Sequence, residues 1–168
     1  LDLAIGIKFG NSGQICVAAN RFFVHSSLYD TFLEKYIERV NKIKLGFGID
    51  QKPDMGPMVT RNDRDRMFEL IEDAVAKGGK VLIGGKIPNG KETGNWMEPT
   101  VISGMTTEMR LFQEETFGPI APFMSFDNDE EVLALANDTE FGLASYIFTD
   151  SNERIHYFSE QLAFGEVQ

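Results

Sequence analysis

The chain has 168 residues, of which 42% are hydrophobic and 25% charged, proportions that are typical of globular proteins and that exclude a disordered or fibrous chain. With 26 acidic against 16 basic residues, its net charge is −10 and no basic stripe is present, so no nucleic acid is expected as a partner. No apolar run approaches the roughly 20 residues that cross a bilayer, and no secretion signal opens the chain. We therefore expect a cytoplasmic protein that makes no membrane contact.

The first elements are read from hydrophobic spacing. Residues 3–9 alternate in hydrophobicity but also contain Ala and Leu, so a strand and a short helix both remain open there. Residues 21–25 are aromatic and β-branched, which predicts a strand. Apolar residues over 29–43 recur at helical spacing, and Ser27 with Asp30 resembles a capping box, so a helix is expected.

The remaining elements continue this alternation. Residues 44–57 carry several turn formers and predict a loop, after which Thr60 with Asp63 caps a helix that ends at Gly78 and Gly79. Further strands are expected over 81–83, 97–102, 120–126 and 144–149, with helices capped by Asp127 with Glu130 and by Asp150 with Glu153.

This order of elements favours an α/β fold with three layers: a largely parallel sheet with helices on both faces. The sequence contains no linker-like stretch and no internal repeat. A single domain over residues 1–168 is the simplest interpretation.

The only cysteine of the sequence, Cys16, lies in a polar, glycine-containing loop before the first predicted strand. One thiol cannot form an internal disulfide or a multi-thiolate metal site. A nucleophilic cysteine needs access and nearby donors or positive charge, whereas free cysteine is also among the most often buried residue types. From the residues alone, a packing role and a catalytic role both remain open.

Other candidate motifs do not support a site. Residues 85–91 have the spacing of a phosphate-binding loop, but Glu92 replaces the Ser or Thr that would hold magnesium, and no helix pattern follows. His25 and His156 are the only histidines, too few for a zinc triad, and we expect them to be structural or surface residues. Trp96 is expected in the core, and no metal is expected.

Two motifs resemble those of the NAD(P)-dependent aldehyde dehydrogenases. The first is Gly13-Gln14-Ile15-Cys16 followed by residues 19–21, and the second is residues 114–119, Glu-Glu-Thr-Phe-Gly-Pro, about a hundred positions later. Further similar stretches lie at residues 1–4, 55–58, 98–100 and 136–144. The last of these is most similar to the succinate-semialdehyde and lactaldehyde branches, and the resemblance implies the fold of the family's catalytic domain.

The resemblance implies a role for each matching residue. Cys16 would attack the aldehyde carbon, giving a thiohemiacetal and then a thioester, and its backbone N–H would donate to the oxyanion. Glu115 would accept hydrogen bonds from the nicotinamide ribose of NAD or NADP, and Phe117 would pack beside the nicotinamide. Without the cysteine motif, Glu115 would read as a solvated acid and Phe117 as a core residue.

The resemblance also implies that some catalytic groups of the family are not among residues 1–168. Family members are about three times longer, and their general-base glutamate, oxyanion asparagine and main dinucleotide site lie upstream of the matching region; no G-x-G-x-x-G occurs here. We therefore expect this chain, alone, to have no dehydrogenase activity. The full-length protein is expected to be a homodimer or homotetramer that acts on a small-molecule aldehyde.

The sequence motifs indicate the type of reaction more specifically than they indicate the substrate. Succinate-semialdehyde enzymes commonly place an arginine six residues before the cysteine to bind the distal carboxylate, but this chain has Gly10 there. Ala18 stands where many of them carry a second cysteine. Succinate semialdehyde, a lactaldehyde-like substrate and other small aldehydes remain open. A CoA-acylating dehydrogenase and a non-catalytic interaction domain are the alternative functions.

Overall fold

A four-stranded sheet forms the centre of the molecule, with strand order β1-β4-β3-β2. The computed structural model describes residues 1–168, apart from the side chains of Asp50 and Gln51. The central strand β4 (Ile120–Phe126) pairs in parallel with β1 (Phe22–His25) and with β3 (Thr100–Ser103). The edge strand β2 (Lys80–Ile83) is antiparallel to β3. Parallel pairing thus dominates the sheet, as the alternation of strands and helices predicts.

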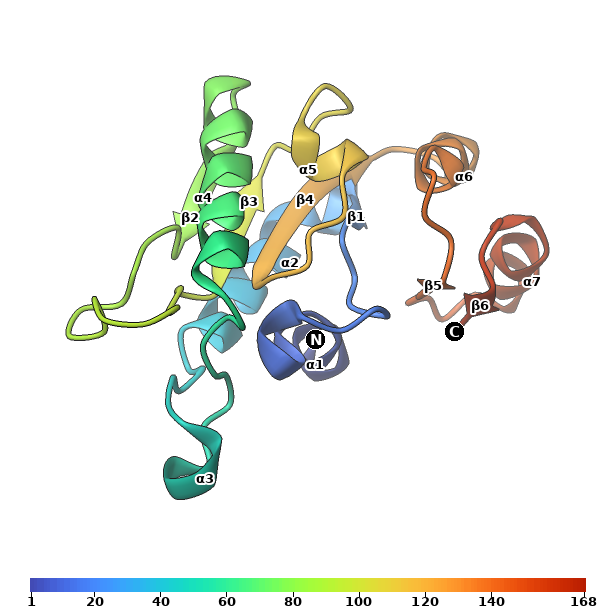
Figure 1. Ribbon diagram of the computed structural model, residues 1–168. Coiled ribbons are helices and arrows are strands. Elements are labelled where there is room, and N and C mark those ends of the chain that lie inside the picture. The colour runs from blue at the N-terminus through green and yellow to red at the C-terminus, as the bar shows by residue number, and fades with distance from the viewer.

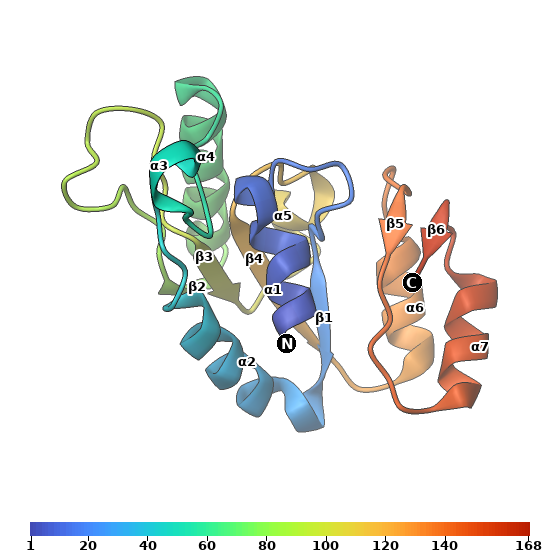
Figure 2. The ribbon, with the colours of Figure 1, turned by 90° about the horizontal axis from the view of Figure 1, so that it is seen from below.

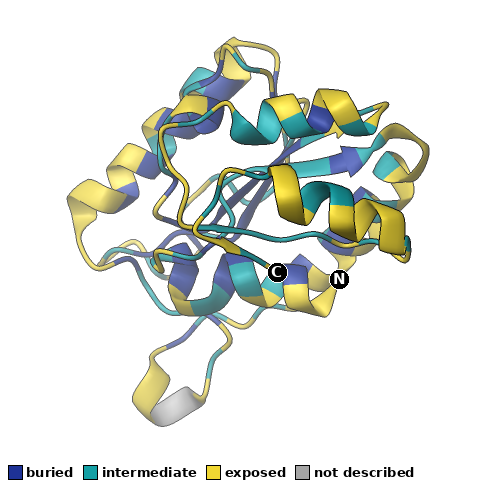
Figure 3. Cartoon of the chain, turned by 90° about the vertical axis from the view of Figure 1, so that its right-hand side faces the viewer, coloured by how far each residue is buried: buried dark blue, intermediate teal, exposed yellow. Residues whose placement is uncertain are grey.

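Each face of this sheet is covered by helices (Figure 1). Because side chains alternate along a strand, Val101 and Phe123 lie in one core cluster and Ile102 and Ile120 in the other. The helices α1 (Asp2–Phe9) and α2 (Ser26–Val40) contribute to the first cluster, and α4 (Arg61–Ala76) and α5 (Arg110–Gln113) contribute to the second. The buried residues follow the strands and the inner sides of the helices (Figure 3). The expected three-layer α/β architecture is confirmed.

A smaller unit follows the main sheet in the chain. It consists of α6 (Asp129–Asn137), β5 (Ala144–Ser145), α7 (Asn152–Gln161) and β6 (Glu166–Val167). Strands β5 and β6 form a separate parallel pair, and the unit lies on the β1 side of the main sheet (Figure 2). The Arg21 guanidinium joins the two parts by donating to the carbonyls of Leu135 and Ala136, 2.9 and 2.8 Å away.

Several sequence-based boundaries are shifted. The ambiguous segment 3–9 is helical, within α1. Helix α2 begins at Ser26, and the His25 imidazole accepts the Ser27 N–H, so the expected capping box of Ser27 and Asp30 is wrong. The strand β1 runs directly into this helix, which places His25 at the capping position. The structural role expected for His25 is therefore confirmed.

The caps of the last two helices are displaced by one residue. Asn128 and Ser151, rather than Asp127 and Asp150, accept the N–H bonds at the starts of α6 and α7. Glu131 instead accepts the backbone N–H of Asp127. Thr60 caps α4 as predicted, through its bond from the Asp63 N–H.

Three short elements differ from the predictions. The expected strand over 144–149 is reduced to β5, and neither α5 nor β6 was predicted. The expected loop over 44–57 contains one short helix, α3 (Gly48–Gln51). None of the helices in the described structure has the length and apolar character needed to cross a bilayer.

Candidate functional site

Cys16 lies on an exposed turn between α1 and β1. A 3-10 turn, Gly10–Gly13, follows α1, and Asn11, Ser12 and Gly13 adopt left-handed φ values of 49°, 61° and 70°. The Ala18 N–H then donates to the Ile15 carbonyl at 2.9 Å, closing a turn around the cysteine. Within the described residues, the Cys16 backbone N–H donates to no acceptor. Both the thiol and this N–H are therefore available to a ligand.

Polar side chains hold this turn against the segment that precedes α4. Ser12 donates to the Gly56 carbonyl at 2.8 Å. The Gln14 side chain accepts the Val59 N–H at 2.8 Å and donates to the Asn11 carbonyl at 3.2 Å. Such bonds offset the backbone strain of residues in the left-handed region, which costs about 1 kcal/mol or more for each non-glycine residue. The position of the cysteine turn is thus fixed by the loop at 56–59.

Residues 114–118 lie directly against the cysteine turn. A Cβ atom on Gly13 would approach the Gly118 carbonyl oxygen to 2.3 Å, far inside van der Waals contact. Gly118 is equally constrained, because its own Cβ would lie 2.5 Å from the Met67 sulfur. Gly13 therefore permits the backbones of the two predicted motifs to approach closely, and Gly118 leaves room for the Met67 side chain. The structure brings together segments that are about a hundred residues apart in the sequence.

Glu115 and Phe117 lie within this second segment. Glu115 is half-buried, and Phe117 is 38% exposed rather than part of the core. The neighbouring Glu114 forms two bonds with the Arg110 guanidinium, at 2.6 and 3.1 Å. The Arg110 bond holds the pKa of Glu114 below its usual range, with Arg66 also contributing. Of the two adjacent acids, Glu114 therefore fixes the segment and Glu115 remains available for a ligand.

Two residues near the site were missed by the sequence reasoning. Lys8 is completely buried, and its Nζ donates to the Thr116 carbonyl at 3.3 Å. The Tyr146 hydroxyl, from the end of β5, donates to the Val17 carbonyl at 2.9 Å, next to the cysteine. Its pKa is raised by burial first and then by the nearby charges of Glu166 and Cys16. Lys8 follows the buried Ala4 by four residues, on the same face of α1. This spacing is the sequence pattern that could have indicated a buried lysine.

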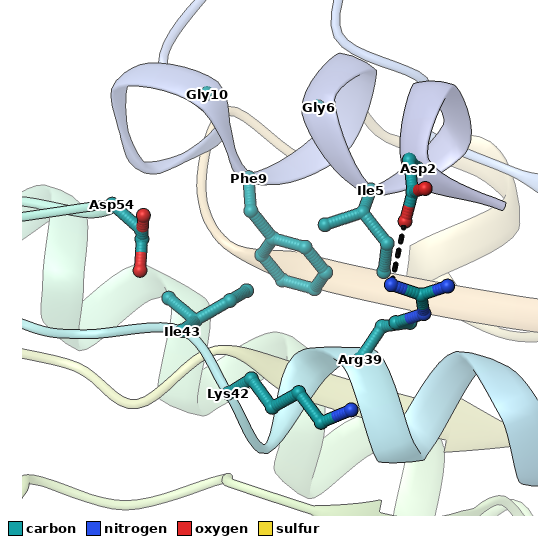
Figure 4. Close-up of a pocket in the computed structure, with 9 residues that line it drawn as sticks. All are labelled: Asp2, Ile5, Gly6, Phe9, Gly10, Arg39, Lys42, Ile43 and Asp54. Carbon is teal, nitrogen blue, oxygen red and sulfur yellow. Dashed lines mark ion pairs between the residues drawn. The ribbon is translucent and has the colours of Figure 1, made fainter.

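One cavity of the molecule lies outside the two motifs (Figure 4). It has a volume of about 370 Å³ and lies between α1 and the end of α2, with Phe9 and Ile43 at its apolar side. Arg39 and Asp2 form an ion pair of 3.2 Å at its edge. Neither Cys16 nor residues 114–118 line it, so we place the candidate site at the two motifs.

The structure also places the other residues and motifs that the sequence offered as candidates. Trp96 is buried, as expected, and Phe47 packs against its ring in an edge-to-face arrangement. Residues 85–91 lead into a loop and not into a helix, unlike a phosphate-binding loop. His156 is exposed on α7. In the described part of the chain, no group of three acidic, histidine or cysteine side chains could hold a metal ion.

Comparison with known proteins gives the family. The model of the aldehyde dehydrogenase family matches residues 1–168. The chain belongs to the aldehyde dehydrogenase family. A curated relative, succinate-semialdehyde dehydrogenase (NADP(+)) 2 of Schizosaccharomyces pombe, is 42% identical over 161 residues, which are 96% of this chain and 32% of the relative.

Solved structures of aldehyde dehydrogenases have the same fold as this chain. Succinate-semialdehyde dehydrogenase from Burkholderia pseudomallei matches with a TM-score of 0.95 and 40% identity, over 99% of this chain and 34% of that chain. Betaine aldehyde dehydrogenase from Staphylococcus aureus in complex with NAD+ matches with a TM-score of 0.94 and 36% identity, over 99% and 33%. The chain thus spans about a third of the length of the relatives that it matches.

Proposed function

We propose that this chain supplies the nucleophile and the nicotinamide-facing segment of an aldehyde dehydrogenase that oxidises a small aldehyde with NAD or NADP. The observation that carries the proposal is the backbone contact between Gly13 and Gly118, which joins the cysteine turn to residues 114–118. Family membership supports the reaction class. In such a full-length enzyme, this chain is joined to the rest of the family fold.

The residues of the second segment fit a nicotinamide nucleotide. The half-buried Glu115 carboxylate can accept hydrogen bonds from ribose hydroxyls. The 38%-exposed ring of Phe117 offers an apolar surface for a planar heterocycle. When bound, the nicotinamide supplies the acceptor for a hydride. We propose that Glu115 and Phe117 orient it beside the thiol of Cys16.

The reaction of Cys16 then follows from the chemistry of a thiolate. Its sulfur adds to the aldehyde carbon, forming a C–S bond and placing negative charge on the former carbonyl oxygen. The Cys16 backbone N–H, which has no acceptor among the described residues, can donate to that oxygen. Loss of hydride from the thiohemiacetal leaves a thioester on Cys16. Addition of water releases the carboxylic acid and restores the thiol.

The remaining catalytic groups are proposed to come from outside this chain. Hydrolysis of the thioester requires a base that activates water. The resemblance assigns this base, the second oxyanion donor and the main dinucleotide site to positions upstream of the matching region. The functions assigned to this chain are therefore nucleophilic attack by Cys16 and part of the nucleotide binding.

The test is Cys16→Ser in the full-length enzyme. We expect NAD(P)H formation to fall below detection, while the melting temperature and nucleotide binding stay near those of wild type, because the side chain is exposed. A variant that still turned over would remove Cys16 from the mechanism. Turnover that requires CoA would indicate an acylating dehydrogenase. Iodoacetamide labelling of Cys16 no faster than that of a free thiol would favour a non-catalytic interaction domain.

For the substrate, we propose a small aldehyde, with succinate semialdehyde among the candidates. The S. pombe relative supports this choice by its name, whereas Gly10 lacks the cation that commonly binds the distal carboxylate. An aldehyde panel with both nucleotides, followed by the absorbance of the reduced nucleotide, decides among the candidates. A cytoplasmic location and a homo-oligomeric assembly also remain proposals, to be tested by fractionation and light scattering.

A further inference from the structure

Lys8 has no part in the steps above, yet its side chain is completely buried. Lysine is almost never fully buried unless it is paired, because desolvating its ammonium group is costly. It lies in the last turn of α1, eight residues before Cys16. A buried lysine next to the proposed site therefore requires an explanation.

The contacts of Lys8 link the two segments of the site. Its Nζ donates to the Thr116 carbonyl at 3.3 Å, the peptide group between Thr116 and Phe117. Its own carbonyl oxygen lies 3.0 Å from the position that a Cβ on Gly13 would occupy. The Thr116 hydroxyl is buried too, and it has no hydrogen-bond partner among the described residues. The Lys8 amino group is thus the polar group that engages residues 114–118 from the side of α1.

The electrostatic environment agrees with this arrangement. Burial lowers the pKa of Lys8 to about 7, while the nearby Glu115 carboxylate acts in the opposite direction. A neutral amine and an ammonium group both carry N–H donors. The bond to Thr116 can therefore form in either protonation state, and the Glu115 carboxylate lies close enough to influence Lys8.

We propose that Lys8 is a positioning residue of the nucleotide site: its buried amino group, bonded to the Thr116 carbonyl, holds Glu115 and Phe117 in register with the cysteine turn. The inference rests on the proposed function, because it assumes that Glu115 and Phe117 contact the nucleotide. Without the amino group, the Thr116 carbonyl loses its donor and the segment can shift. The nucleotide, rather than the aldehyde, is then bound less well.

The test compares Lys8→Met with Lys35→Met in the full-length enzyme. Methionine keeps the length of the stem but removes the donor, and Lys35 is an exposed lysine on α2 that serves as the matched control. We expect Lys8→Met to raise the KM for NAD(P)+ roughly fivefold to tenfold, the range expected for one lost hydrogen bond. The KM for the aldehyde should change little, and Lys35→Met should leave both KM values unchanged.

A second variant keeps the test decisive if Lys8→Met does not fold. Lys8→Gln retains an N–H donor on a shorter stem and should give a nucleotide KM between those of wild type and Lys8→Met. A folded Lys8→Met with a wild-type nucleotide KM would overturn the proposal, and so would a Lys8→Gln whose nucleotide KM is raised as far as that of Lys8→Met. An equal rise in the KM of both substrates would also overturn it, since it would indicate general damage.

Failure of the inference can be separated from failure of the proposed function. Glu115→Gln should raise the nucleotide KM and Cys16→Ser should abolish turnover, whatever Lys8 does. If these two variants behave as expected and the Lys8 variants do not, only the positioning role is lost. If Glu115→Gln leaves the nucleotide KM unchanged, the nucleotide assignment of residues 114–118 is wrong.

Discussion

Lys8 also carries the clearest pH dependence among single residues. Its pKa is about 7 in the fold and 10.5 ordinarily, and the cause is burial. Between these values the unfolded chain binds more protons than the folded one, so the stability of the fold rises with pH through this range. Below pH 7 the penalty for burying the charge is fully present, and above 10.5 it has disappeared.

We therefore predict that the stability difference between Lys8→Met and wild type depends on pH. Relative to wild type, the variant should be more stable at pH 6 than at pH 9, by an amount on the order of 2 kcal/mol. Thermal unfolding of both proteins at the two pH values measures it. The exposed Lys35→Met should show no such change, and a pH-independent difference for Lys8→Met would mean that Lys8 is not desolvated in the fold.

Among the secondary-structure elements, α6 depends most clearly on a single distant side chain. Arg21 donates to three carbonyls at the C-terminal end of α6, those of Leu135, Ala136 and Asp138. These are the groups that a helix leaves without partners, and a cation there also complements the helix dipole. The guanidinium in addition lies 4.8 Å from the centre of the Phe112 ring. Arg21 therefore joins the smaller unit to the main sheet.

We predict that Arg21→Met destabilises the fold by about 2 kcal/mol, since three bonds to a charged donor are lost and two of their carbonyls are partly buried. Arg154→Met is the matched control at the other end of α6. Its pair with Asp129, at 2.8 Å, is partly exposed and should contribute less than about 1 kcal/mol. Unfolding and amide exchange in α6 measure both effects, and equal losses for the two variants would contradict the prediction.

The helices and strands also differ in how well their boundaries can be predicted from the sequence. The helix over Arg61–Ala76 was predicted with its correct cap because Thr60 and Asp63 precede a regular apolar stripe. The cap of α2 was missed because His25 is an uncommon capping residue, and only the strand before it places the imidazole there. The strand β6 was missed because its two residues are too few for any alternation to be visible.

The candidate site was predicted in part, from motifs rather than from periodicity. Cys16, Glu115 and Phe117 are predicted because they stand in specific motifs, and their roles stay predictions; Cys16 and Phe117 are exposed in the described structure. Lys8 and Tyr146 were not found, because their roles arise from contacts more than a hundred residues away along the chain. Single-sequence patterns carry no information on such contacts.

For the molecule as a whole, we predict that the purified 168-residue chain has no dehydrogenase activity. It spans about a third of its relatives, and the base that activates water is assigned to the remainder. NAD(P)H absorbance with an aldehyde panel measures this, with the full-length enzyme as the positive control. Steady turnover by the chain alone would show that residues 1–168 contain a base that the mechanism above does not include.

The contact between Gly13 and Gly118 has a consequence for how this site can change by mutation. At this point the two halves of the site touch through main-chain atoms alone, with no side chain between them. Their spacing at this point is therefore set by the close approach of main-chain atoms and not by the size of a replaceable side chain. Under the proposed function, we expect new aldehyde preferences to arise from substitutions at positions other than Gly13 and Gly118, such as Gly10.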